Sequence, residues 1–194
     1  FERRHGIAKA GGRTRDVYGE LADLGLAGLA VPESQGGMGF GPIEAMVVLE
    51  ELGRGLVNAP YAAAALMSPA LLAAGDDAVQ SAWLPKIADG SALVVPALQE
   101  QGARYRQDVV ATTATQQGGQ WVLHGAKHLV PAGDEADAFV VPARVGPHAV
   151  APIGLFVVER ARCQVRAYPT ADGARAASLT LAASPASLVN NDAL

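Results

Sequence analysis

Two histidines with a possible metal-binding spacing stand in the second half of the chain. His124 and His128 are four residues apart, which on a helix would place two imidazoles on one face. Gly125 and the strand-like residues around it do not favour a helix, and no carboxylate is placed to complete a ligand set. Cys163 is the single cysteine, which excludes an intramolecular disulfide and a zinc site built from cysteines. We therefore predict that the chain binds no metal.

A glycine-rich stretch, Gly36-Gly37-Met38-Gly39-Phe40-Gly41, is a second candidate for chemistry because such loops can approach a phosphate closely. Its spacing differs from G-x-G-x-x-G, and no clear strand precedes it. We interpret the stretch as a bend between two helices. Serine, histidine and aspartate occur without the nucleophile-elbow pattern of a hydrolase.

The composition favours a globular protein with a large core and without nucleic acid as a partner. Half of the 194 residues are hydrophobic and the net charge is −4, whereas a nucleic-acid surface requires a basic face. Residues 56–75 carry no charge, but Asn58, Pro60 and Pro69 interrupt them, so we expect short buried helices and no membrane span. The charged start lacks a secretory pattern, and with one cysteine a cytoplasmic location is expected. The first residue is Phe1, which suggests a fragment.

The first half of the chain has helical patterns. Thr14 is placed to cap a helix that Gly25 ends, and a helix from Pro42 is followed by Gly53 as its terminator. A third helical stretch is expected over residues 60–74. Asp76 or Asp77 is placed to cap a fourth, which we expect to end near Pro85.

After residue 90 the pattern changes to short β-branched segments. Residues 109–115 and 121–123 flank Gln116-Gln117-Gly118-Gly119-Gln120 and predict a hairpin with a loose turn. Further strands are expected over residues 138–141, 155–158 and 178–181. The order predicts an α+β protein with a helical N-terminal domain over 1–90. An antiparallel β-barrel or sandwich domain is expected over 91–194.

Three segments together resemble one family. Residues 21–40, with Val31-Pro32-Glu33 and the glycine-rich bend, resemble the N-terminal helical domain of the acyl-CoA dehydrogenases. Ala97-Leu98-Gln99-Glu100-Gln101-Gly102-Ala103-Arg104-Tyr105-Arg106 is similar to the family's A-x-T-E-P-G-A-G-S-D loop. Trp121-Val122-Leu123-His124-Gly125-Ala126-Lys127-His128-Leu129-Val130-Pro131 is similar to its W-V-L-N-G-x-K-x-[FW]-I-[ST] segment. The loop at 102–105 and Asp172-Gly173-Ala174-Arg175-Ala176-Ala177 resemble more narrowly the small subunit of pimeloyl-CoA dehydrogenase.

The resemblance implies FAD-dependent α,β-desaturation of an acyl-CoA thioester, with electron-transferring flavoprotein as acceptor and a homo- or hetero-oligomer. The family's glutamate base lies in a C-terminal helical domain that is absent here. We therefore assign no catalytic residue among these 194, and Glu33, Glu50, Glu51 and Glu100 are not put in its place. Glu100 is expected to organise its loop, and Lys127 to be a surface or interface charge.

By position, the resemblance implies cofactor contacts from Leu98, Gln99, Tyr105, Leu129, Val130 and Pro131. Gln99 replaces a threonine that hydrogen-bonds the flavin, and Leu129 replaces an aromatic residue that packs on it. Pro131 replaces a serine or threonine and has no hydroxyl or N–H to donate. Arg104 and Tyr105 replace a small Gly-Ser pair, although Arg104 could bind a phosphate or a substrate carboxylate. FAD binding could thus be weak or lost in this subunit.

Two other functions remain open at this point. One is a flavin-poor structural or regulatory subunit of a heteromeric acyl-CoA dehydrogenase, and the other is a different flavin chemistry on the same fold, such as a monooxygenase or nitroalkane oxidase.

Overall fold

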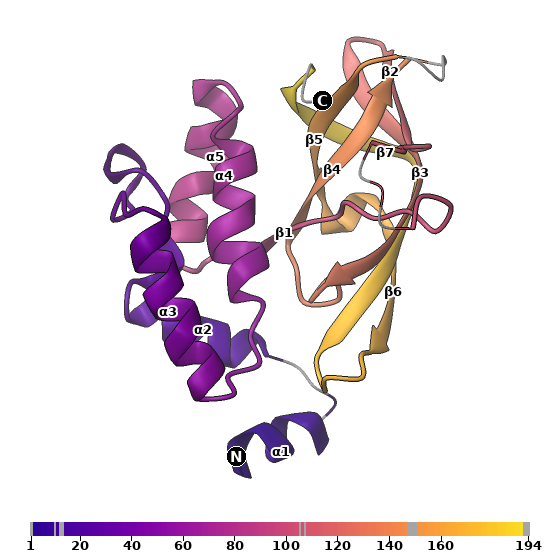
Figure 1. The fold of residues 1–194 in the computed structure, drawn as a ribbon. Coiled ribbons are helices and arrows are strands. Elements are labelled where there is room, and N and C mark those ends of the chain that lie inside the picture. The colour runs from indigo at the N-terminus through magenta and orange to yellow at the C-terminus, as the bar shows by residue number, and fades with distance from the viewer. Residues whose placement is uncertain are drawn as a thin grey trace.

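Helices form the first half of the chain, as Figure 1 shows. The computed structural model describes residues 2–9, 11, 14–104, 106, 108–146 and 151–191. The helices are α1 (Glu2–Lys9), α2 (Arg15–Asp23), α3 (Pro42–Arg54), α4 (Ser68–Leu72) and α5 (Asp77–Ala88). Two 3-10 turns, η1 (Leu26–Gly28) and η2 (Glu33–Gln35), separate α2 from α3, and a π-helical turn, η3 (Ala62–Met67), leads directly into α4. In Figure 1, α2–α5 gather on one side of the molecule and the strands on the other.

The helix boundaries largely follow the local sequence signals. Gly25 adopts a φ of 79° just after α2, and the Asp76 carboxylate accepts the Val79 N–H at 2.9 Å at the start of α5. The prediction that this helix ends near Pro85 was wrong, because α5 continues to Ala88. Ile87 and Ala88 are buried, and this burial offsets the backbone hydrogen bond that proline cannot make.

The second half is a closed, twisted barrel with two additional strands. The strands are β1 (Val94–Pro96), β2 (Thr113–Gln117), β3 (Gln120–Pro131), β4 (Ala138–Val145), β5 (Ile153–Glu159), β6 (Gln164–Pro169) and β7 (Arg175–Asn190), with the turn η4 (Arg160–Arg162) before β6. The ring runs β4-β2-β3-β7-β5 and closes through the β4–β5 pairing, while β1 pairs with β4 and β6 with β7. All pairings are antiparallel except those of β4 with β1 and β2. The predicted fold class is confirmed, and no helix follows β7 within the described residues.

The predicted hairpin is β2–β3, but its turn is tight and not loose. Gln117 pairs with Gln120, which leaves Gly118 and Gly119 as a two-residue turn. Their φ angles are 58° and 84°, a conformation that glycine adopts without strain and that suits the strand twist.

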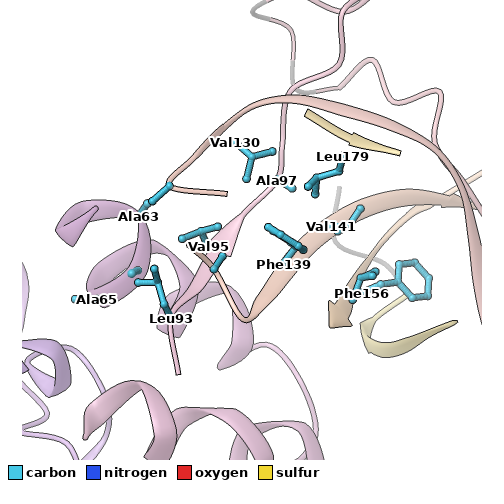
Figure 2. Packing of buried hydrophobic residues seen from close by; sticks show 14 of the residues in the cluster. Ala63, Ala65, Leu93, Val95, Ala97, Val130, Phe139, Val141, Phe156 and Leu179 are labelled. Atoms are coloured by element: carbon cyan, nitrogen blue, oxygen red, sulfur yellow. The ribbon is translucent and has the colours of Figure 1, made fainter. Parts of the chain in front are cut away.

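The core joins the helices to the barrel, as Figure 2 shows. Ala63 and Ala65 from η3 lie close to Leu93 and Val95 from the β1 segment, and small side chains at η3 permit this close approach. The buried Ser68 hydroxyl lies 2.8 Å from the Val94 carbonyl and thereby links α4 to β1. The division of the chain between residues 90 and 91 into two domains stays a prediction. No helix within the described ranges combines the length and apolar character needed to cross a membrane.

Candidate functional site

The fold brings together the two segments that were expected to contact a cofactor. The His128 N–H donates to the Gln99 carbonyl at 2.8 Å, which joins the loop after β1 to the end of β3. Gln99 and Leu129 both line a cavity of about 860 Å³. Leu98 is half-buried and is not part of this lining.

The other predicted contacts are placed differently. Val130 is only 1% exposed and belongs to the core, as Figure 2 shows, whereas Pro131 is exposed but outside the lining. Tyr105 lies outside the described residues. Contact between a flavin and any of the six predicted residues stays a prediction.

Strands that the sequence reasoning did not connect with the site complete the cavity. β6 was not among the predicted strands, yet it supplies Arg166 and Tyr168, and β7 supplies Ser178. The signal was the two-residue spacing of Arg166 and Tyr168, which places them on one face of a strand. Among the described residues, the lining is Gln99, Glu100, Gln101, Arg104, His128, Leu129, Arg166, Tyr168 and Ser178.

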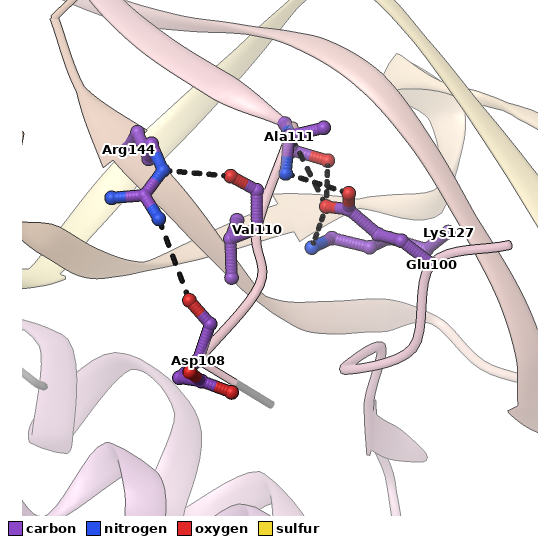
Figure 3. Close-up of polar contacts among 7 residues, drawn as sticks. Glu100, Asp108, Val110, Ala111, Lys127 and Arg144 are labelled. Carbon is purple, nitrogen blue, oxygen red and sulfur yellow. Dashed lines mark hydrogen bonds and ion pairs between the residues drawn. The ribbon is translucent and has the colours of Figure 1, made fainter. Parts of the chain in front are cut away.

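A buried ion pair joins Glu100, which lines the cavity, to Lys127, and Figure 3 shows the two side chains. Glu100 accepts hydrogen bonds from the Lys127 ammonium (2.7 Å), the Thr112 hydroxyl (2.6 Å) and N–H (3.1 Å), and the Ala111 N–H (2.7 Å). Glu100 therefore organises its loop, as expected. The prediction of Lys127 as a surface or interface charge was wrong, because its side chain is fully buried against Glu100. With both oxygens engaged, the Glu100 carboxylate is not free to act as a base.

Burial and pairing act in opposite directions on this carboxylate. Burial raises the pKa of Glu100, but the hydrogen bond and charge of Lys127, with Thr112 and Ala111, bring that pKa below its usual value. Burial lowers the pKa of Lys127, while Glu100 opposes that change. The Glu100 carboxylate is thus ionised, and the Lys127 ammonium balances its charge.

The rest of the lining is cationic. The side chains of Arg104 and Arg166 have no hydrogen-bond or ion-pair partner among the described residues, and both residues are exposed. Glu100 is the single carboxylate among the lining residues that the structure describes, and Lys127 neutralises it. Two free guanidinium groups beside an open cavity favour an anionic ligand such as a phosphate or carboxylate.

Leu129 has a strained backbone at the cavity. Its φ is 51°, which is rare for a residue other than glycine, and its side chain is 55% exposed. The Leu129 N–H donates to the Tyr168 hydroxyl at 2.9 Å, and Ser178 Oγ lies 3.1 Å from His128 Nδ1. Strain of this kind is concentrated at functional sites.

The two histidines have different hydrogen-bond partners in this structure. His124 Nδ1 accepts the Ala183 N–H at 3.3 Å, whereas His128 contacts Ser178 at the cavity. Within the part of the chain that the structure describes, no three potential ligands gather as a metal site.

A second cavity, of about 850 Å³, lies along α3 and is mostly apolar. Val48 and Leu52 pack on the core, but Ile43, Met46 and Val47 are more than half exposed. The glycine-rich bend before α3 is a bend between helices, as predicted. There Gly37 passes so close to the Val31 carbonyl that a Cβ would lie 2.1 Å from its oxygen.

Comparisons with known proteins identify similar sequences and similar folds. Residues 2–91 match the family model described as "Acyl-CoA dehydrogenase, N-terminal domain". The chain is 34% identical to the acyl-CoA dehydrogenase FadE12 of Mycobacterium tuberculosis over 138 residues, which are 68% of this chain and 34% of that protein. It spans between 21% and 39% of the length of the curated relatives that it matches.

Two solved structures illustrate the shared fold. The ChsE4-ChsE5 complex from Mycobacterium tuberculosis contains a chain that is 28% identical, with a TM-score of 0.85 over 98% of this chain and 52% of that one. The acyl-CoA dehydrogenase from Bacillus anthracis complexed with FAD is 23% identical, with a TM-score of 0.77 over 91% of this chain and 32% of that one, and shows the fold alone. From the matched helical domain and the barrel that follows it, the chain belongs to the acyl-CoA dehydrogenase family.

Proposed function

We propose that this chain forms the helical and β-barrel part of an FAD-dependent acyl-CoA dehydrogenase that desaturates an acyl-CoA thioester between its α and β carbons. The observation that carries the proposal is the cationic cavity where residues 99–101 and 128–129 meet. Both segments resemble the family's flavin-contacting segments.

The cavity lining fits FAD in size and chemistry. Its volume of about 860 Å³ lies in the range of cofactor sites. Arg104 and Arg166 offer charge for a pyrophosphate, the side-chain amides of Gln99 and Gln101 offer donors and acceptors, and Tyr168 offers an aromatic surface. FAD, when bound, supplies the oxidation by accepting a hydride from the acyl chain.

The residues of this chain bind and orient, and none is assigned a proton transfer. Glu100 and Lys127 fix the loop that carries Gln99 and Arg104, because their bonds tie that loop to Ala111 and Thr112. Glu100 cannot remove an α-proton while its two oxygens accept four hydrogen bonds. The base is therefore proposed to lie outside these 194 residues.

The finer assignments are also part of the proposal. The acceptor would be electron-transferring flavoprotein, the working form a homo- or hetero-oligomer with another acyl-CoA dehydrogenase chain, and the compartment the cytoplasm. The resemblance to the pimeloyl-CoA dehydrogenase small subunit stays a prediction. Arg104 and Arg166 would suit an acyl group with a terminal carboxylate as well as a phosphate.

Flavin binding and bleaching test the proposal. The full-length protein, purified with any subunit that co-purifies so that the proposed base is present, would be titrated with FAD and then mixed anaerobically with mono- and dicarboxylic acyl-CoAs. Loss of the oxidised flavin absorbance with one of them is the expected result. Binding of FAD without bleaching by any thioester would contradict the dehydrogenase assignment and favour another flavin chemistry.

A second candidate is a flavin-poor structural or regulatory subunit of a heteromer. Pro131 and Leu129 favour it, since neither offers the hydroxyl or the ring expected beside a flavin, and the ChsE4-ChsE5 structure is a two-component complex. Purification without flavin, together with restored flavin content on adding a second dehydrogenase chain, would support this alternative.

A further inference from the structure

Tyr168 on β6 supplies an aromatic side chain near Leu129, which stands where the family has an aromatic residue. Tyr168 and Arg166 are two residues apart on that strand and both line the cavity, so their side chains share one face. Among the described strands β6 pairs only with β7, and β7 in turn pairs with β3, which carries Leu129. The Tyr168 side chain therefore lies on an edge strand that borders the cavity.

The Tyr168 phenol extends from β6 to β3. Its hydroxyl accepts the Leu129 N–H at 2.9 Å, although β7 lies between the two strands. Tyr168 is paired with Ala176 on β7, whose small side chain leaves room for a ring to pass. Tyr168 and Leu129 therefore border the same cavity, with the Tyr168 hydroxyl at the backbone of Leu129.

We propose that Tyr168 provides the aromatic face against which the planar ring system of FAD packs, and that Arg166 binds a phosphate of the same ligand. This inference rests on the proposed function and adds β6 to the site. Leu129 offers a smaller, flexible surface, and its strained backbone is held by the Tyr168 hydroxyl. Packing of one aromatic ring on another stabilises a complex beyond the area it buries.

Two flavin ligands distinguish the role of Tyr168 from the role of Arg166. FAD has both a ring system and a pyrophosphate, whereas riboflavin has the ring system without phosphate. Tyr168→Leu should lower the affinity for both ligands by about three- to tenfold. Arg166→Gln should lower the affinity for FAD by a similar factor and leave the affinity for riboflavin unchanged.

The experiment is a fluorescence titration of the purified full-length protein and its variants with FAD and with riboflavin. Arg162→Gln, at an exposed arginine of η4 outside the cavity, is the matched control for charge. Ala167→Leu, on the opposite face of β6, tests whether the strand accepts a leucine. Both controls should bind the two ligands as the unaltered protein does.

Tyr168→Phe provides a test that does not depend on how well Tyr168→Leu folds. Tyr168→Phe retains the ring and should retain affinity within about twofold, but phenylalanine does not quench flavin emission by electron transfer as tyrosine does. Brighter emission from bound flavin is therefore expected in this variant. Unchanged affinity in a folded Tyr168→Leu protein, or unchanged emission in Tyr168→Phe, would overturn the role of Tyr168 and leave FAD binding intact. Absence of binding by the unaltered protein would instead overturn the proposed function.

Discussion

Glu135, in the turn between β3 and β4, caps the start of α2 through Arg15. Its carboxylate accepts the Arg15 N–H at 2.6 Å and the Thr14 N–H at 3.0 Å, while the Arg15 guanidinium donates to the Glu135 carbonyl at 2.9 Å. The Thr14 side chain, expected to form this cap, makes no such bond. An acidic group from the barrel thus satisfies the free amides of a helix terminus.

Glu135→Ala should therefore destabilise the protein by about 1–2 kcal/mol, because a helix N-terminus loses both its acceptor and a favourable charge. Urea unfolding followed by circular dichroism measures the change. Asp23→Asn is the matched control at the last residue of the same helix, where a negative charge is unfavourable, and it should leave stability unchanged or slightly higher. Equal losses for both variants would contradict a capping role.

Removing the ammonium from the buried pair has a larger effect. Lys127→Met leaves the Glu100 carboxylate buried without a counter-charge, which should cost about 3–5 kcal/mol in the free energy of unfolding. The double variant Lys127→Met/Glu100→Gln removes both charges and should recover part of this loss. If the double variant is less stable than Lys127→Met, the pair is not coupled as the structure implies.

The same pair predicts a dependence on acid. Since the pKa of Glu100 is lower in the folded protein than its ordinary value of 4.5, the unfolded chain binds the proton first as the pH falls. The stabilisation is complete above pH 4.5 and is lost as the pH falls through the lower folded value. Urea midpoints measured from pH 7 downward should fall less steeply in Glu100→Gln than in the unaltered protein. Parallel curves would contradict the assignment.

Alanine should have opposite effects at a glycine of the bend and at a glycine of α2. Gly37→Ala would place a methyl group 2.1 Å from the Val31 carbonyl oxygen, so the bend must shift, at a cost of about 2 kcal/mol or more. Gly19→Ala, within α2 and with open space around it, should stabilise by about 0.5–1 kcal/mol. Thermal unfolding of both variants checks the prediction, and a tolerated Gly37→Ala would show that the bend is adaptable.

Local signals predicted most of the helices and several of the strands. Gly25 and Asp76 act through their own neighbours, as a left-handed terminator and an N-cap, so their roles were visible in the sequence. Glu100 could be identified as a loop organiser from the family pattern. The order of helices followed by strands also followed from the change in periodicity after residue 90, which left a barrel and a sandwich both open.

The remaining features depend on contacts between distant segments. Lysine is a residue type that usually lies at the surface. Only the position of Glu100, 27 residues away, explains the burial of Lys127. β6 is an edge strand with mixed exposure, so its alternation is weak, and its role depends on pairing with β7. Tyr168 reaches the site by crossing β7 to Leu129, a relationship that no spacing in the sequence encodes.

Arg104 allows a test of whether backbone strain in the site is retained for ligand binding. It has a φ of 53° and lines the cavity without a partner among the described residues. Arg104→Gly should stabilise the protein by up to about 1 kcal/mol, because glycine accepts this conformation, and should weaken FAD binding by about tenfold through loss of the guanidinium. Leu56→Gly is the control, since Leu56 has a φ of 51° and lies outside the cavity, so it should relieve strain without changing FAD affinity. Chemical unfolding and FAD titration of both variants separate the two effects, and unchanged FAD affinity in Arg104→Gly would remove Arg104 from the proposed site.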